Sequence, residues 1–224
     1  MPEQQPGQPL AGRSAPGVSM RRFGPEHQQD LTVLLANAFL DDPVAAWCVP
    51  DQDERFQVMT RYFEIVVEHV LEHGVAYGPP DMIGAALWLD MLGSRAPRID
   101  GLDQRLLAAC GPFTGQFIEL GAAFNGVHPK RPHWYLLFMG VVPAWRDKGI
   151  GSALLAFHHR SLDDHGHAAY LEASSTANRR LYQRNGYADL DGSPLVLPGG
   201  PNVWPLWRAP QTSPPAIRLT ALAG

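Results

Sequence analysis

A short run of cations and glycines at residues 146–151 has the clearest chemical meaning in this chain. It reads Arg-Asp-Lys-Gly-Ile-Gly, and small or apolar residues then recur at helical spacing from Ile150 to Phe157. A helix that begins at such a turn presents unpaired backbone N–H groups and the positive end of its dipole. Because the glycines carry no side chain, an anion can approach those groups. The turn therefore predicts a binding site for a phosphate group.

The spacing of this turn separates it from two common nucleotide motifs. A dinucleotide fingerprint needs a third small residue where this chain has Leu154, and a Walker loop needs lysine after the glycine, whereas Lys148 precedes it. The pattern Arg-x-x-Gly-x-Gly after Val-Val-Pro at 141–143 instead resembles the acetyl-CoA pyrophosphate loop of the GNAT superfamily of N-acetyltransferases. A glycine-started helix that binds nothing is the alternative interpretation.

A second motif, at residues 171–187, resembles the GNAT element that lies along the other side of the cofactor. Its strand places Glu172 and Ser174 on one face, Thr176 is predicted to cap a short helix, and Gly186 is predicted to end that helix in a left-handed conformation. The two motifs in this order are more specific than either alone. On this basis the chain is identified as a member of the GNAT superfamily.

The resemblance implies catalytic roles for two side chains and one backbone group. Glu172 would be the base that takes a proton from the substrate ammonium group, directly or through a water, and Tyr182 would be the general acid toward the CoA sulfur. The backbone N–H of Val142 would polarise the thioester carbonyl. The structural alternatives are that Glu172 is a rim carboxylate paired with an arginine and that Tyr182 packs the short helix on the sheet.

The resemblance also implies acetyl-CoA as the acetyl donor and no metal. The pantetheine arm would be bound by the backbone of Val141 and Val142 and by a polar contact from Asn178. The residues of the pyrophosphate cradle would be Arg146, Asp147, Lys148, Gly149, Ile150, Gly151, Ser152 and Ala153.

Two further groups of polar residues receive structural interpretations. Asp42 could attract a cationic amine, but its position before Pro43 is explained by a helix cap. The pairs His158-His159 and His165/His167 lack neighbouring ligands at metal-site spacing, so we interpret them as surface or helix-end histidines.

The composition of the chain limits its domain organisation and its partners. With 224 residues, 45% of them hydrophobic, the sequence predicts a single domain over residues 18–209, flanked by polar tails at 1–17 and 210–224. A net charge of −4 argues against nucleic acid or an anionic membrane as a partner. Two cysteines and no charged-then-apolar leader favour a cytoplasmic protein without disulfides. We expect a monomer or a homodimer.

Hydrophobic periodicity predicts the elements that must position these residues. They are a strand at 19–23, helices at 27–39, from Pro43 and at 53–73, strands at 74–77 and 82–90, a broken helix at 103–125, a strand at 133–142, and a closing hairpin of 195–197 with 203–207. Pro205 would demote the last strand to an edge or a bulge. Together with the resemblance, this order implies an α/β (α+β) GNAT fold, a mixed and mostly antiparallel central sheet of about six to seven strands with helices on both faces.

Within the superfamily, the chain is similar to puromycin N-acetyltransferase and its relatives. The similarity rests on Phe-x-Asp-x-Pro at 39–43, the basic-Pro-aromatic stretch at 130–134 and Leu-Glu-x-Ser at 171–174. It implies transfer of the acetyl group to a primary amine of a small xenobiotic or antibiotic-like molecule, directly in a ternary complex, as in antibiotic resistance. A CoA-binding sensor or scaffold without turnover, and a protein or peptide N-acetyltransferase, remain alternatives. Residues 75–128, on the acceptor side, depart from the family pattern.

Overall fold

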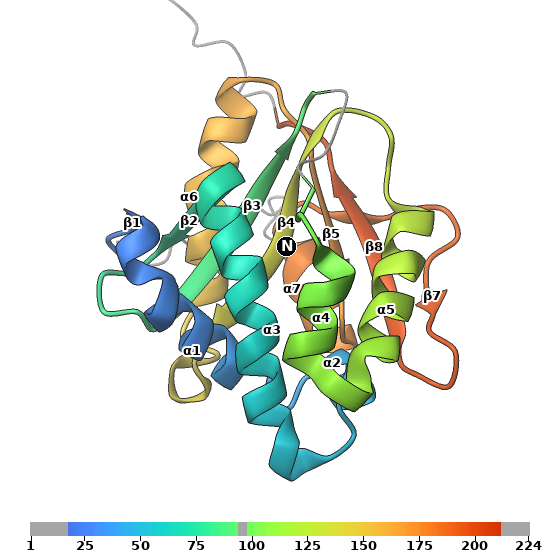
Figure 1. Cartoon of the computed structure of the whole chain (residues 1–224). Coiled ribbons are helices and arrows are strands. Elements are labelled where there is room, and N and C mark those ends of the chain that lie inside the picture. The colour runs from blue at the N-terminus through green and yellow to red at the C-terminus, as the bar shows by residue number, and fades with distance from the viewer. Residues whose placement is uncertain (1–17, 94–97, 212–224) are drawn as a thin grey trace, which may run out of the picture.

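The computed structural model describes residues 18–93 and 98–211, which form a mixed sheet with helices on both faces (Figure 1). Eight strands follow the order β1-β2-β3-β4-β5-β8-β6, with β7 paired to β8. Strands β4 and β5 run parallel, whereas the other neighbouring pairs are antiparallel. The predicted mixed, mostly antiparallel architecture is confirmed, with eight strands in place of six to seven.

The elements lie close to the predicted ranges. The strands are β1 (Arg21–Phe23), β2 (Gly74–Gly78), β3 (Gly84–Met91), β4 (His133–Val141), β5 (Ala169–Ala173), β6 (Ala188–Asp189), β7 (Leu195–Val196) and β8 (Asn202–Arg208). The α-helices are α1 (Gln28–Phe39), α2 (Pro43–Cys48), α3 (Gln52–His73), α4 (Leu102–Cys110), α5 (Thr114–Val127), α6 (Ile150–Asp164) and α7 (Thr176–Arg184). Short 3-10 turns are η1 (Pro25–His27), η2 (Gly111–Phe113) and η3 (Pro143–Trp145). The predicted tails lie outside the described residues, except that Gln211 donates its N–H to Asp163.

Two apolar cores cover the two faces of the sheet. Helices α1 to α5 lie on the face toward the viewer and α6 lies behind it (Figure 1). On the first face, Leu31 and Leu35 of α1 and Phe63 of α3 are fully buried. On the other, Leu154 and Leu155 of α6 are buried against β3 and β4. Burying each of these side chains contributes about 1.5–3 kcal/mol, which explains why the apolar stripes predict the packing.

Helix ends follow their local sequence, with one correction. Asp42 caps α2, as predicted, by accepting the N–H groups of Val44 and Ala45. The prediction that Thr176 caps α7 is wrong by one residue, because Ser175 has the extended backbone of a cap and its hydroxyl accepts the N–H of Asn178.

The prediction that Pro205 places the last strand at an edge or a bulge is also wrong. Strand β8 lies between β5 and β6, and Pro205 stands opposite Glu172 in the β5 ladder. The carbonyl of Pro205 accepts the N–H of Leu190 on the β6 side, so its ring nitrogen points to that side too. The Leu190 carbonyl, which would accept a bond from a residue other than proline at this position, accepts the N–H of Ser193 instead, so the proline is tolerated.

The interpretation of His158 and His159 as surface residues is wrong. Both lie on α6 with only 6% of their surface exposed, and the His158 ring packs 4.4 Å from the ring of Trp88. Burial lowers the pKa of His158 to about 4 and that of His159 to about 3, so both are neutral core residues.

None of the described helices is long and apolar enough to cross a lipid bilayer.

The middle of the sheet is interrupted where β4 meets β5. Leu87 and Trp88 of β3 pair with Phe138 and Leu136, so Leu137 is an extra residue that forms a β-bulge in β4. Strand β4 pairs with β5 only at Trp134 and Tyr135. Beyond that point the two parallel strands diverge, which leaves backbone groups of β4 without a strand partner on that side.

Candidate active site

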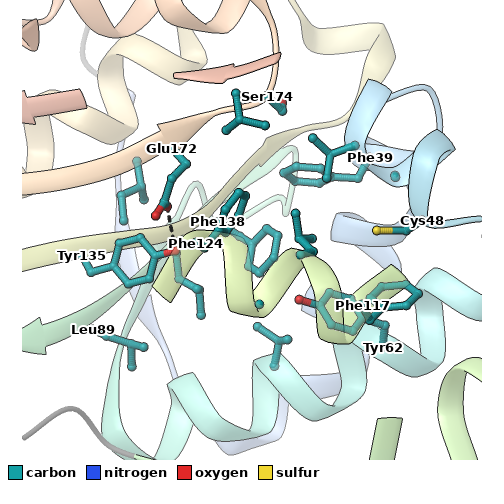
Figure 2. Close-up of a pocket in the computed structure, with 18 of the residues that line it drawn as sticks. Phe39, Cys48, Tyr62, Leu89, Phe117, Phe124, Tyr135, Phe138, Glu172 and Ser174 are labelled. Carbon is teal, nitrogen blue, oxygen red and sulfur yellow. Dashed lines mark hydrogen bonds between the residues drawn. The ribbon is translucent and has the colours of Figure 1, made fainter. Parts of the chain in front are cut away.

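A pocket of about 880 Å³ lies where β4 and β5 diverge. Residues of β3, β4 and β5 form one wall, and helices α2 to α5 form the other. Figure 2 shows that most of the labelled side chains around it are aromatic: Phe39, Tyr62, Phe117, Phe124, Tyr135 and Phe138. The pocket is therefore an apolar chamber with a small number of polar groups, a composition typical of small-molecule sites.

The polar groups gather at one end of this chamber. Glu172 comes from β5 and Ser174 directly follows that strand. Asn178 and Tyr182 come from α7, and Asp42 is the N-cap of α2. The structure thus brings together Glu172, Tyr182 and Asn178, three side chains that we predicted at the site.

Glu172 is buried and has a tyrosine as its partner. Its side chain is 3% exposed, and the Tyr135 hydroxyl donates to its Oε2 at 2.8 Å (Figure 2). Burial raises the pKa of Glu172 to about 7, although the bond from Tyr135 acts in the opposite direction. Half of these carboxyls are ionised near neutral pH, which suits a group that must accept and release a proton. The alternative of a rim carboxylate paired with arginine does not fit this environment.

Tyr182 lies on the inner side of α7 and faces the same end of the chamber. It is 7% exposed, and its ring packs at 5.8 Å against that of Tyr187. Burial raises the pKa of its hydroxyl, so the group stays protonated and can donate. The structure is compatible with both interpretations, because the same side chain packs the helix and borders the pocket.

Asp42 serves a second purpose besides capping α2. Its Oδ2 accepts the hydroxyl of Ser174, and the Asn178 side-chain amide donates to Ser174 Oγ at 3.2 Å. Burial raises the pKa of Asp42, while its hydrogen bonds act against the rise. This chain of contacts joins α2, β5 and α7 at the polar end of the pocket, a role that the sequence did not reveal.

Tyr135 and His128 are two pocket residues that sequence reasoning missed. Tyr135 is paired in register with Tyr170 on β5, and His128 follows the end of α5 with its Nδ1 4.0 Å from Glu172 Oε1. Tyr135 stands in a continuous apolar strand, so nothing in its local pattern marks it. The only signal in the sequence was the pair His128 and His133, which flank the loop at residues 129–132 and could have marked it as part of a site.

The glycine turn has the backbone geometry of an anion site. Gly149 caps α6 with φ 81°, and Asp147 has φ 60°, so both lie in the left-handed region. The first bond of the helix runs from the Ala153 N–H to the Gly149 carbonyl. The N–H groups of Ile150 and Ser152 at this helix start therefore have no acceptor within the helix.

The side chains of the turn contribute less than the sequence suggested. Arg146 donates to the carbonyls of Ala38 at 2.7 Å and Val141 at 3.4 Å, so it holds the turn against the end of α1. Lys148 Nζ lies 4.5 Å from the centre of the Trp145 ring. A Cβ on Gly151 would meet Leu181 at 3.2 Å, so this glycine also permits close packing of α6 on α7.

The role assigned to the Val142 N–H is contradicted by the structure. That N–H donates to the Ile83 carbonyl at 3.0 Å, and the Val142 carbonyl accepts from Trp145. Hydrogen-bonded and non-bonded pairs alternate in an antiparallel ladder, and Val141 and Met139 occupy the non-bonded register positions next to Val142. Their N–H groups therefore point away from β3, toward the side where β5 diverges. These are the backbone donors in β4 that face the gap.

Comparison with known proteins assigns this geometry to a family. Residues 107–189 match the model of the acetyltransferase (GNAT) domain, a stretch that includes Glu172, Tyr182 and the glycine turn. The chain contains a GNAT acetyltransferase domain. An uncharacterized N-acetyltransferase of Schizosaccharomyces pombe is 24% identical over 189 residues, which cover 76% of this chain and 74% of the relative.

Solved structures agree with the GNAT assignment. A Corynebacterium glutamicum protein described as histone acetyltransferase HPA2 and related acetyltransferase has 25% identity and a TM-score of 0.67, over 87% of this chain and 97% of its own. Arylalkylamine N-acetyltransferase 2 of Aedes aegypti shares the fold at 14% identity and a TM-score of 0.56, over 86% and 99%. The predicted GNAT fold is confirmed, and the relatives support an N-acetyltransferase. The similarity to the puromycin N-acetyltransferase group stays a prediction.

Proposed function

We propose that this GNAT domain transfers an acetyl group from acetyl-CoA to the primary amine of a small molecule with a bulky apolar body, directly in a ternary complex. The observation that carries the proposal is the position of Glu172. It is a buried carboxylate with a pKa near 7, and it lies where the gap in the sheet meets the aromatic chamber. An acetyl donor and an amine that enter from these two sides meet at its side chain.

The donor side is built mainly from backbone. The N–H groups at the start of α6 suit the pyrophosphate of acetyl-CoA, and the exposed edge of β4 suits its pantetheine arm. The chemistry that acetyl-CoA supplies is a thioester carbonyl with a good leaving group. The N–H groups of Met139 or Val141 would polarise that carbonyl, in place of the Val142 N–H.

The side chains then account for the proton transfers. Glu172 takes one proton from the ammonium group, which gives a neutral amine whose lone pair attacks the polarised carbonyl. Tyr182 gives its hydroxyl proton to the departing sulfur and regains a proton from the amide nitrogen that has just formed, through solvent. The balance is one amide, one thiol and one proton released from Glu172 for each turnover.

The acceptor side favours an amine with a single charge. Among the described lining residues the only carboxylates are Asp42 and Glu172, and the remaining surface is dominated by aromatic and aliphatic groups. A polyamine would bury several cations without partners, which costs several kcal/mol for each charge. A monoamine with an aromatic or aliphatic body instead places one cation at Glu172 and its apolar part in the chamber. Puromycin and other xenobiotic amines fit this description.

One experiment tests the proposal. Release of free CoA thiol from acetyl-CoA is measured over a panel of acceptors: phenylethylamine, puromycin, ethylamine, spermidine and a lysine peptide. We expect phenylethylamine or puromycin to exceed ethylamine and spermidine by at least tenfold in kcat/KM. Binding of CoA without thiol release for any acceptor would favour the sensor alternative. Preference for the peptide would favour a protein acetyltransferase.

The two cysteines bear on where this reaction takes place. Cys48 and Cys110 are both buried as free thiols, and burial raises the pKa of each, to about 12 and about 11. A chain whose thiols pack as small apolar groups suits a reducing compartment, and we propose the cytoplasm.

A further inference from the structure

Glu172 must lose a proton after every turnover, yet only 3% of its side chain is exposed. Its Oε2 is occupied by the Tyr135 hydroxyl. Its Oε1 has no hydrogen-bond partner among the residues that the structure describes. The nearest titratable nitrogen to Oε1 is His128 Nδ1, at 4.0 Å, on a side chain that is 17% exposed. His128 therefore lies between the buried carboxylate and the surface.

A second histidine fixes which nitrogen of His128 carries the proton. His133 Nδ1 is 2.7 Å from the Arg131 carbonyl, which can only accept, so this nitrogen is protonated. In the neutral ring, His133 Nε2 is then an acceptor. It lies 3.1 Å from His128 Nε2, which must donate. The Nδ1 of His128 is consequently bare, and its lone pair is on the side of Glu172.

Both imidazoles are neutral near pH 7. Burial is the main cause that lowers the pKa of His128, to about 4, and His133 lowers it further. The pKa of His133 is lowered by burial as well, while its bond to Arg131 opposes the change. The rings of Tyr135 and Tyr170 pack against His128 at 4.8 and 4.9 Å, so the groups around it are two protonated tyrosines, His133 and Glu172.

We propose that His128 is the proton acceptor that regenerates Glu172, and that His133 is a positioning residue that holds His128 in the required tautomer. This inference rests on the proposed function. The proton taken from the substrate ammonium moves from the Glu172 carboxyl to His128 Nδ1, which makes an imidazolium and restores the carboxylate. A separation of 4.0 Å is about one ångström too long for a direct transfer, so a water bridges the two groups or the ring approaches. Because the pKa of His128 lies below that of Glu172, the imidazolium is short-lived, and it gives its Nδ1 proton to solvent water, which leaves Nδ1 bare again.

Kinetics of His128→Gln distinguish a proton relay from a structural role. Glutamine can still donate to His133 through its amide, but it has no basic nitrogen that could accept the proton from Glu172. We expect kcat to fall by at least tenfold, the KM for acetyl-CoA to stay within twofold, and imidazole at millimolar concentration to restore part of kcat. His165→Gln is the matched control, because His165 is exposed at the end of α6 and its side chain bonds only to the Ser161 carbonyl among described residues. It should match wild type.

A second readout does not depend on turnover. Nitrogen NMR of the free protein should show His128 protonated at Nε2 and bare at Nδ1, and His133→Leu should allow the other tautomer. His128 in the Nδ1–H tautomer, or a kcat of His128→Gln equal to wild type at every buffer concentration, overturns the relay. If wild type acetylates no amine, the proposed function fails instead and the relay falls with it.

Discussion

The proposed donor side of this GNAT domain consists mainly of backbone groups, whereas the proposed acceptor side consists of side chains. On the donor side, the turn before α6 and the free edge of β4 offer backbone N–H groups, and the cationic side chains there bond to carbonyls or pack on a ring. On the acceptor side, the chamber wall consists of side chains from α2 to α5 and β3 to β5. A backbone site depends on conformation, whereas a side-chain site depends on which residues meet. A sequence motif therefore predicts the donor side, whereas no sequence motif predicts the acceptor side.

Glu172 belongs to both sides, so its removal should have the largest effect. We expect Glu172→Gln to lower kcat by about 10²–10⁴-fold, because the general base is lost, with CoA affinity unchanged by calorimetry. A variant that keeps more than half of wild-type kcat would show that another group is the base.

The thermal stability of Glu172→Gln tests whether this variant is folded. The pKa of Glu172 is raised from 4.5 to about 7, so the folded state binds this proton more tightly than the unfolded state and wild-type stability falls as pH rises from about 4.5 to 7. Removing the ionisable group removes this cost, which is roughly 3 kcal/mol above pH 7. Glu172→Gln should therefore unfold at a higher temperature than wild type at pH 8, and the difference should shrink at pH 5.

The next effect should be confined to the acceptor side. Phe124 on α5 borders the chamber (Figure 2), and Phe124→Ala should lower kcat/KM for an apolar amine by about 10–100-fold, since 1–3 kcal/mol of apolar contact is lost. The KM for acetyl-CoA should not change. Ile118→Ala on the same helix is the control, because Ile118 is 46% exposed and does not line the pocket. Equal losses in both variants would contradict an acceptor role for the chamber.

A smaller effect should be confined to the donor side. Gly149→Ala forces a side chain into a left-handed conformation at a cost of about 1–2 kcal/mol, so we expect the turn to shift and the KM for acetyl-CoA to rise about 5–20-fold. The KM for the amine should stay the same. Gly166→Ala provides the control, because Gly166 also has a positive φ, 69°, but lies beyond the other end of α6. A rise in KM with this control would mean that general destabilisation is the cause.

The smallest effect should be a displacement of the pH profile. In the proposed mechanism Glu172 acts as a carboxylate, so kcat/KM should rise with pH through about 7. The Tyr135 hydroxyl lowers the pKa of Glu172 by donating to it, so Tyr135→Phe should move the midpoint to higher pH. The plateau rate should change less than tenfold. A midpoint that does not move would indicate that another group governs the profile.

The local structure of this chain could be predicted from its sequence, whereas the contacts between its helices and strands could not. The apolar stripe of α1, the cap at Asp42 and the glycine turn are set by residues a few positions apart, and the structure has them as predicted. The assignment to the Val142 N–H failed because the register with β3 decides which groups of β4 are free. Pro205 was misjudged because the short β6 pairs beside it.

By itself, the sequence determined that residues 146–151 form a glycine turn at the start of a helix and that the fold is of the GNAT type. That is possible because the geometry of a helix start is encoded by glycines and spacing within about ten residues. Only the tertiary structure decided which side chains surround Glu172. Tyr135 and His128 reach it from a neighbouring strand and from the end of α5, and such contacts depend on strand register and helix packing. The acceptor chamber was decided in the same way, mainly by helices α2 to α5 and strands β3 to β5, which meet only in the folded protein.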